Sequence, residues 1–256
     1  MKRTLLIDGD EFVHVCSSAV EYEARWDDQN IILASNVEEA WDAFQSRLES
    51  VLDRIHGEKT ILFAFTGPEN FRKSIYPNYK AKRGGRKPLC FSDLKRRVFE
   101  NYDCYTETKL EADDLLGIWA TNGQHENPVI VSQDKDFLTI PTTLWREGSL
   151  LVLGQGDADF HWLKQTLTGD TSDGYPGCPG FGPVSAEKLL DTFVALDGSF
   201  LVDEAWKAIV QHYEKKGLSA ADALTQARLA RILRATDWDE EKREVKLWTP
   251  PRIEPL

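Results

Sequence analysis

The sequence predicts an α/β fold with a mostly parallel central sheet, helices on both faces of the sheet, and a helical C-terminal part. Short runs that are apolar at successive positions, as buried parallel strands are, recur up to residue 132. Segments with the 3/4 spacing of a helical face separate these runs, which is the order of β–α–β units. Beyond residue 157 the helical pattern continues almost alone.

The N-terminal elements carry recognisable start and stop signals. The first strand, Thr4–Ile7, ends at Asp8. The capping-box pattern Ser35-x-x-Glu38 begins a helix, and Gly57 ends it. The next predicted elements are a strand at 60–65, a strand at 104–106, a helix at 111–121 and a strand at 128–132.

The second part of the chain is predicted to be helical. Amphipathic stretches lie near 185–196, 200–216 and 219–234, and a closing strand is predicted at 243–248. We therefore expect an α/β part, residues 1–156, followed by a helical part, residues 157–256.

The composition excludes several classes of protein. The 256 residues are 41% apolar and 29% charged with a net charge of −11, which is ordinary for a globular chain. The four cysteines form no C-x-x-C pair, so neither a zinc site nor a disulfide scaffold is indicated. The N-terminal apolar run is too short for a signal peptide, and no stretch approaches a membrane span. We expect a cytoplasmic protein with no membrane partner and with any metal held by oxygen.

One segment is strongly basic although the chain as a whole is acidic. Residues 72–97 contain ten Lys and Arg residues and one acid, Asp93. Such a segment could contact a polyanion, or it could be a solvated basic loop or helix face. Tyr76, Tyr79 and Phe91 lie among these charges, where they could stack on bases or belong to the core.

Eight carboxylates follow predicted strands or open predicted helices and loops. Each group alone has a structural alternative as a helix cap or a turn. Together they would repel one another at one edge of the sheet, and divalent cations would relieve that repulsion. Two Mg²⁺ ions so held can contact both the attacking and the leaving oxygen of a phosphodiester, so we expect phosphodiester hydrolysis. The eight residues are Asp8, Glu111, Asp113, Asp114, Asp134, Asp136, Asp170 and Asp173.

A glycine-rich loop at 175–183 precedes a predicted helix near Ser185. Glycines allow backbone amides to approach phosphates closely, and the helix N-terminus adds a favourable dipole. The pattern predicts a helix–hairpin–helix module that binds a nucleic-acid backbone without reading its sequence. A plain Pro/Gly connector is the structural alternative.

Five motifs in this sequence resemble, in their order, those of a known family. The resemblance is to the 5′-nuclease (flap endonuclease) superfamily, and within it to the 5′→3′ exonucleases of short-tailed, podovirus-type phages. It extends from about residue 3 to residue 250. The motifs are L-L-I-D-G-D, F-R-x-x-x-x-P-x-Y-K-A-K-R, E-A-D-D, S-Q-D-K-D-F and G-D-T-S-D-G-Y-P-G-C-P-G-F-G-P.

The resemblance implies a PIN-like 5′-nuclease fold with a basic helical arch over residues 72–100. It implies that the eight carboxylates bind two Mg²⁺ ions, which Mn²⁺ could replace, and that a K⁺ ion could bind at the glycine-rich loop. The implied catalytic residues are Lys80, Arg83 and Arg72. The implied DNA contacts are Tyr79, Lys82, Arg86, Lys87, Gly177, Gly180, Gly182 and Ser185.

The expected substrates are duplex DNA with 5′ ends or flaps, and RNA primers in RNA–DNA hybrids. A replicative polymerase or a single-strand-binding protein is an expected partner. Two alternatives remain open from the residues: a non-catalytic DNA junction-binding replication protein, and a ribonuclease that acts on single-stranded RNA. The first predicts binding that needs no metal and yields no product.

The chain departs from the family pattern at one place. The resemblance implies an Asp at the end of the second strand, shortly before Arg72, but segment 65–72 contains none. Glu69 lies close in the sequence and is a hypothetical replacement. The departure concerns the affinity of one metal ion.

Overall fold

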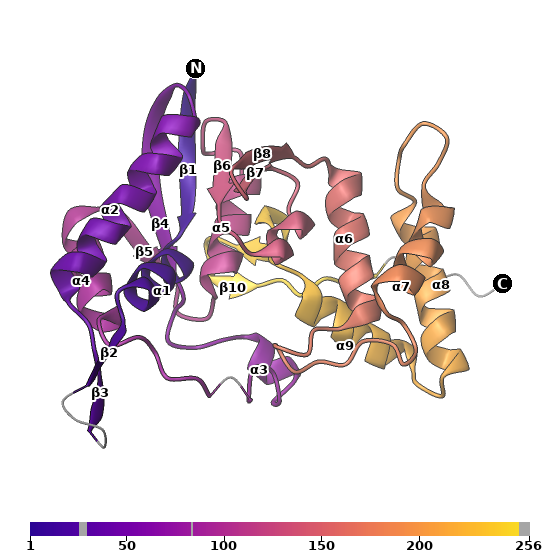
Figure 1. Ribbon diagram of the computed structural model, residues 1–256. Coiled ribbons are helices and arrows are strands. Elements are labelled where there is room, and N and C mark those ends of the chain that lie inside the picture. Colours follow the sequence, from indigo (N-terminus) through magenta and orange to yellow (C-terminus); the bar gives the residue numbers. More distant parts are fainter. Residues whose placement is uncertain (26–29, 83, 251–256) are drawn as a thin grey trace.

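The computed structural model describes residues 1–25, 30–82 and 84–250, and a six-stranded sheet forms the centre of its N-terminal half (Figure 1). The strand order is β5-β4-β1-β6-β7-β8, with parallel pairing except between β7 and β8. This confirms the predicted mostly parallel sheet. The strands are β1 (Lys2–Asp8), β4 (Glu58–Phe65), β5 (Cys104–Thr106), β6 (Pro128–Val131), β7 (Thr143–Arg146) and β8 (Ser149–Val152).

Helices cover both faces of the sheet, because successive strand residues point to opposite sides. Leu5 and Ile7 of β1 pack into one cluster with three helices, whereas Leu6 packs into a second cluster with α5. The three helices on the first face are α1 (Gly9–Ala19), α2 (Val37–Arg54) and α4 (Phe91–Asn101), and α5 (Ala112–Thr121) lies on the second.

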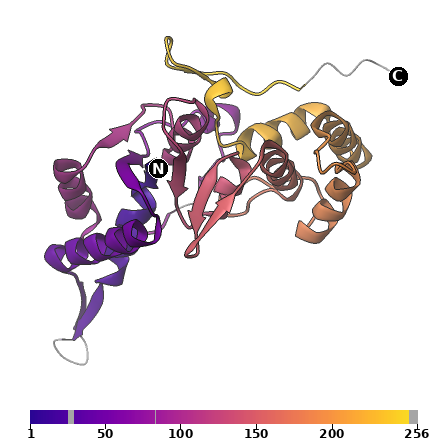
Figure 2. The same cartoon turned by 90° about the horizontal axis from the view of Figure 1, so that it is seen from above.

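A helical part follows the sheet and lies beside it, as the view from above shows (Figure 2). Its own core surrounds the buried side chains of Trp162, Trp206 and Tyr213. None of the described helices has the length and apolar character needed to cross a membrane. The four helices are α6 (Gln155–Thr168), α7 (Pro183–Leu190), α8 (Val202–Lys215) and α9 (Ala220–Ala230).

Several element boundaries differ from the prediction. Helix α2 begins at Val37, because the side chain of Asn36, and not that of Ser35, accepts the backbone N–H of Glu38. Helix α9, predicted at 219–234, ends at Ala230 and not near 234. Of the closing strand predicted at 243–248, only Glu244–Val245 forms a strand, which pairs with two residues outside the main sheet. Short elements that the prediction missed or misplaced are β2 (Tyr22–Arg25), β3 (Ile31–Ala34), β7, β8, β9 (Trp238–Asp239) and β10 (Glu244–Val245).

The predicted helical arch over 72–100 is helical only at its two ends. Helix α3 (Arg72–Ile75) is one turn long, and α4 packs into the core through Phe91 and Leu94. The described residues between these helices form turns and irregular chain. Pro77 and Pro88 lack a backbone N–H, and two glycines lie between them, so this stretch is a poor helix former.

The aromatic cluster under the first face of the sheet provides a test of the fold. Phe44 is fully buried and contacts the rings of Phe12, Phe63 and Tyr102. We expect Phe44→Ala to lower the free energy of unfolding by about 3–5 kcal/mol, because the lost contacts leave a cavity. Urea unfolding followed by circular dichroism measures this, with the exposed Leu196→Ala as control. Equal effects of the two substitutions would contradict the packing.

Candidate functional site

Strands β1 and β6 bring two of the predicted carboxylates together at the carboxyl edge of the sheet. Asp8 ends β1 and caps α1, accepting the backbone N–H of Glu11 at 3.1 Å. Ser132, which directly follows β6, donates its hydroxyl to Asp8 at 3.1 Å. The same hydroxyl accepts the backbone N–H of Asp134 at 3.1 Å. A single serine therefore links the ends of two neighbouring parallel strands, where ligands bind in open sheets.

The start of α5 and the loop after α6 contribute a second group of carboxylates, and residues of the arch segment contact both members. The hydroxyl of Tyr79 donates to Glu111 at 3.0 Å and to Asp173 at 2.9 Å. The ammonium of Lys80 pairs with Glu111 and lies 3.7 Å from Asp173. Two consecutive residues of the basic segment thus connect carboxylates that lie 62 positions apart in the sequence.

Asp136 and Asp170 lie at the same edge, next to the first group. The carboxylate of Asp170 accepts the backbone N–H of Ser172 at 2.7 Å and lies 3.8 Å from the ammonium of Lys135. Partial burial, together with the negative charge of Asp134, raises the pKa of Asp136 to about 6. Asp113 interacts electrostatically with Asp8, Glu111 and Asp134, and Asp136 with Asp134 and Asp170, so these acids lie near one another.

The electrostatics of the site are uneven. Burial, together with the charges of Glu11 and Asp10, raises the pKa of Asp8 to about 7. Desolvation and the nearby charge of Asp8 raise the pKa of Asp113 well above its ordinary value. Burial also acts to raise the pKa of Glu111, but the positive charges of Arg72 and Lys80 overcome it and lower that pKa to about 2.

These side chains fit a hard divalent cation by their donor chemistry. All are oxygen donors, and the raised pKa values of Asp8 and Asp136 show charges that burial and neighbouring acids disfavour. Within the described residues, no group of three Asp, Glu, His or Cys side chains already has a metal-holding arrangement. Two of the carboxylates, Glu111 and Asp173, are paired with Lys80 and Tyr79 in this structure.

Arg72 was predicted to be catalytic, and the structure corrects this. Its side chain is 3% exposed, and all five of its N–H donors are used within the protein. They bond to Glu111 (3.1 Å), to both oxygens of Asp114 (2.7 and 2.8 Å), and to the carbonyls of Leu229 (3.1 Å) and Arg231 (2.7 Å). A guanidinium so enclosed holds other residues in place and does not touch a substrate.

Asp114 was predicted to bind metal, which the structure also corrects. It is fully buried, and besides Arg72 its carboxylate accepts the backbone N–H groups of Glu111 at 3.2 Å and Leu233 at 3.1 Å. Four donors therefore occupy its two oxygens. Asp114 is a structural residue beneath the site.

The predicted DNA contacts of the arch divide into two classes. Tyr79 is 3% exposed and its ring cannot stack on a base, so its prediction as a DNA contact is wrong. The other three contacts are exposed: Lys82, Arg86 and Lys87. Arg86 forms a bidentate ion pair with Glu21. Arg83 lies outside the described residues.

The glycine-rich loop precedes a helix as predicted, but its amides are not equivalent. Gly177 is buried and donates its N–H to Gln226 at 2.8 Å, so it is not available to a phosphate. Gly180 is exposed, with a φ of 88° that favours glycine. Gly182 donates its N–H to the hydroxyl of Ser185 at the start of α7.

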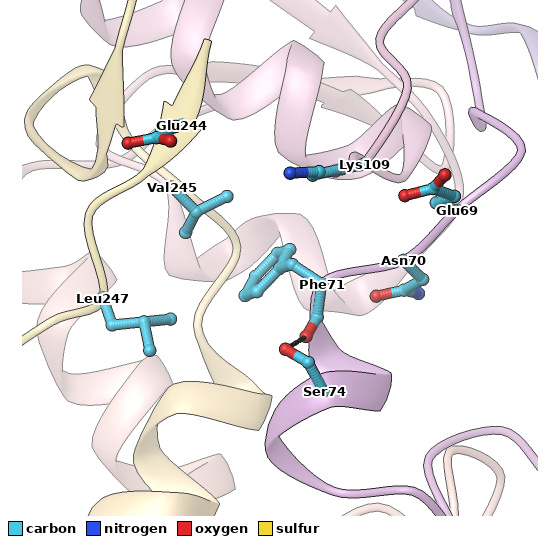
Figure 3. A pocket seen from close by; sticks show the side chains of 8 residues that line it. All are labelled: Glu69, Asn70, Phe71, Ser74, Lys109, Glu244, Val245 and Leu247. Atoms are coloured by element: carbon cyan, nitrogen blue, oxygen red, sulfur yellow. Dashed lines mark hydrogen bonds between the residues drawn. The ribbon is translucent and has the colours of Figure 1, made fainter. Parts of the chain in front are cut away.

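The segment after β4, where the family pattern has an Asp, leaves no room for a side chain at Gly67. A Cβ at Gly67 would collide with the carbonyl oxygen of Glu107, because segment 67–71 is bonded to segment 108–110. Glu69 does not replace it: Glu69 lines a pocket that contains none of the eight predicted ligands (Figure 3). Instead, Asp10 lies at this strand end and accepts the backbone N–H of Thr66 at 2.7 Å. The prediction missed Asp10, although the motif D-G-D contains it.

The raised pKa of Asp8 predicts a pH-dependent stability. The folded protein binds this proton more tightly than the unfolded chain, so the metal-free protein should lose stability as the pH rises from about 4 to about 7. Asp8→Asn removes the titration. Between pH 5 and pH 8 in EDTA, we expect the variant to gain roughly 2 kcal/mol relative to wild type. Urea unfolding at both pH values measures the difference in the free energy of unfolding between the variant and wild type. If that difference is the same at pH 5 and pH 8, the prediction is wrong.

Comparison with known proteins shows the family to which the chain belongs. The family model described as 5′-3′ exonuclease, N-terminal resolvase-like domain, matches residues 3–146. The exodeoxyribonuclease of Enterobacteria phage T3 is 30% identical over 97% of this chain and 93% of its own length. The exonuclease of Escherichia phage T7 is also 30% identical, over 97% of this chain and 94% of its own.

Solved structures share the fold. The T5 5′-exonuclease with bound zinc ions superposes with a TM-score of 0.60 at 14% identity, covering 90% of this chain and 89% of that one. The bacteriophage T5 flap endonuclease in complex with DNA and metal ions gives a TM-score of 0.60 at 13% identity, covering 92% and 90%. Because the family model matches more than half of its length and both phage enzymes align almost end to end, the chain belongs to the 5′–3′ exonuclease family.

Proposed function

We propose that this 5′–3′ exonuclease hydrolyses phosphodiester bonds at the 5′ ends and flaps of duplex DNA, using divalent metal ions held at the carboxyl edge of the sheet. One observation carries the proposal. Lys80, at the base of the exposed basic segment, contacts Glu111 and Asp173 in the carboxylate group itself. A polyanion that lies along Lys82 to Lys87 would therefore end at those carboxylates.

Seven of the eight predicted carboxylates remain candidates to hold two Mg²⁺ ions. Asp10 of α1, whose carboxylate lies beside the end of β4, is a candidate to replace the missing Asp. When bound, the ions would neutralise the carboxylates and stabilise the charge that develops on the phosphate. Mn²⁺ could replace Mg²⁺, and the carbonyls of loop 175–182 could hold K⁺. The seven carboxylates are Asp8, Glu111, Asp113, Asp134, Asp136, Asp170 and Asp173.

Lys80 is proposed to stabilise the transition state, with Arg83 beside it in the sequence. Its backbone has a φ of 53°, a left-handed conformation that is strained for lysine. The backbone N–H of Lys80 donates to the carbonyl of Asp173 at 2.7 Å, which fixes this conformation. A phosphate at the site would compete with Glu111 and Asp173 for the ammonium, because all three are anions.

Duplex DNA is proposed to bind along the exposed part of the glycine-rich loop, at Gly180 and the start of α7. Contacts to the backbone do not distinguish sequences, and RNA–DNA hybrids are part of the same proposal. The alternative of a non-catalytic junction-binding protein is not favoured, since the buried acids of a retired site would only destabilise the fold.

The metal site is tested with a 5′-labelled flap duplex and a blunt duplex. We expect short products with Mg²⁺ and none in EDTA, and Asp134→Ala should lower the rate by at least about 10³-fold because it removes a metal ligand. Glu69→Gln is the matched acidic control, since Glu69 lines a different pocket, and its Mg²⁺ dependence should equal that of wild type. Binding without cleavage by wild type in every condition would favour the junction-binding alternative.

The role of Lys80 is tested by comparing Lys80→Ala with Lys82→Ala. Lys80→Ala should lower kcat by about 10²-fold while changing KM for the duplex little, because it removes a charge near the reacting phosphate. Lys82 is exposed and two positions away, so Lys82→Ala should act mainly on KM. Steady-state cleavage of the flap substrate separates the two constants. Equal losses in kcat and in duplex affinity for Lys80→Ala would refute the assignment.

A further inference from the structure

We propose that residues 229–237, which are the last two residues of α9 and the segment that follows it, act as a positioning strap that sets the geometry of the catalytic carboxylates from the far end of the chain. This inference rests on the proposed function. After α9 the chain turns back toward the sheet, where its yellow C-terminal segment lies near α5 (Figure 1). Contacts between α5 and the 3₁₀ turn η3 (Ala235–Asp237) confirm that approach.

The strap completes the bonding of Arg72. The carbonyls of Leu229 and Arg231 accept two of its five N–H groups, and the other three go to Glu111 and Asp114. Arg72 in turn contacts the carboxylate of Glu111 at 3.1 Å. Without the two strap carbonyls, buried donors of a guanidinium would lack partners, and its orientation toward Glu111 would no longer be fixed.

The strap is also seated directly on the helix that carries Asp113. The backbone N–H of Leu233 donates to Asp114 at 3.1 Å. Gly117, one turn further along α5, allows this approach, because a Cβ there would collide with the carbonyl oxygen of Leu233. Helix α5 thus contacts the backbone of a residue more than 110 positions away.

Two buried ion pairs fasten the strap. Arg231 donates to Asp237 at 2.8 Å, and Arg234 donates to Asp159 of α6 at 2.7 Å. Arg234 also donates to the carbonyl of Thr139, which ends the 3₁₀ turn η1 (Lys135–Thr139). The η1 turn contains Asp136 and directly follows Asp134. The strap therefore contacts the two elements, α5 and η1, that carry carboxylates from both sides of the site.

The chain beyond the strap supports the same arrangement. Val245 and Leu247 face Phe71 across a cavity of about 390 Å³ (Figure 3). Phe71 directly precedes Arg72 and packs with Leu233 and Trp238 in one small cluster. Buried ion pairs contribute little net stability because their desolvation is costly, whereas they fix geometry strongly. This favours positioning over simple stabilisation as the role of the pairs.

The test uses Asp237→Asn, which removes one charge from the strap without changing its size. We expect kcat to fall by about tenfold or more and the Mg²⁺ concentration for half-maximal rate to rise several-fold, as when a residue behind metal ligands is lost. KM for the duplex should change less than twofold. Val51→Ala, a core truncation in α2, is the matched control that lowers the melting temperature without touching the strap.

A measurement without DNA provides the second readout. Mg²⁺ should raise the melting temperatures of wild type and of Val51→Ala with the same midpoint concentration. For Asp237→Asn, the midpoint of this rise should lie at a higher Mg²⁺ concentration. Gly117→Ala displaces the strap without burying an unpaired charge, and it should behave like Asp237→Asn. It carries the test if Asp237→Asn does not fold.

The outcomes separate the two proposals. If wild type cleaves but both strap variants lose only melting temperature, as Val51→Ala does, the strap is purely structural and the inference is overturned. If wild type shows no metal-dependent cleavage, the proposed function fails and the inference fails with it. Loss of kcat together with a raised Mg²⁺ midpoint supports the strap.

Discussion

The saturated guanidinium of Arg72 is the interaction on which the rest of the site depends. Its five donors join three parts of the chain: the start of the arch, the start of α5, and the end of α9 with the residue that follows it. Because the guanidinium is buried and every donor is used, moving any one partner leaves a buried N–H group without a hydrogen-bond acceptor. Removing one partner of a buried ion pair typically costs about 3–5 kcal/mol.

The same guanidinium explains why the carboxylates differ from one another. Glu111 lies against Arg72 and Lys80 and has a low pKa, whereas burial and neighbouring acids dominate at Asp8 and Asp113 and raise their pKa values. The site thus combines a carboxylate that cations of the protein stabilise in its charged form with others whose charge burial and neighbouring acids disfavour. A divalent cation binds most favourably to the second kind, because it relieves desolvation and repulsion together.

The basic segment shows that the number of charges is a poor guide to the charge that a ligand meets. Arg72 is buried, Lys80 is paired with Glu111, and Arg86 is paired with Glu21. The charges of Lys95 and Arg97 are also partly offset, by Asp10 and Glu38. What reaches solvent is a shorter basic stretch around Lys82 and Lys87, and it begins where the carboxylates lie.

The sequence by itself determined the four parallel strands β1, β4, β5 and β6, the presence of helices on both faces of the sheet, and the placement of the acids at its carboxyl edge. Those features follow from local patterns: an apolar run makes a strand, and the residue after a parallel strand lies at the carboxyl edge wherever the strand is placed. The motifs D-G-D, E-A-D-D and S-Q-D-K-D therefore indicate the site from the sequence alone.

Only the tertiary structure decided what each residue does there. Arg72, Asp114 and Tyr79 have the residue types of functional groups, yet they are buried and hold the site together through partners that include residues 32 to 159 positions away. No local pattern encodes such distant partners. Likewise, an acid at position 67 is excluded only because another segment packs against Gly67. Burial and partner geometry are properties of the folded chain, and they separate a ligand from the residue that positions it.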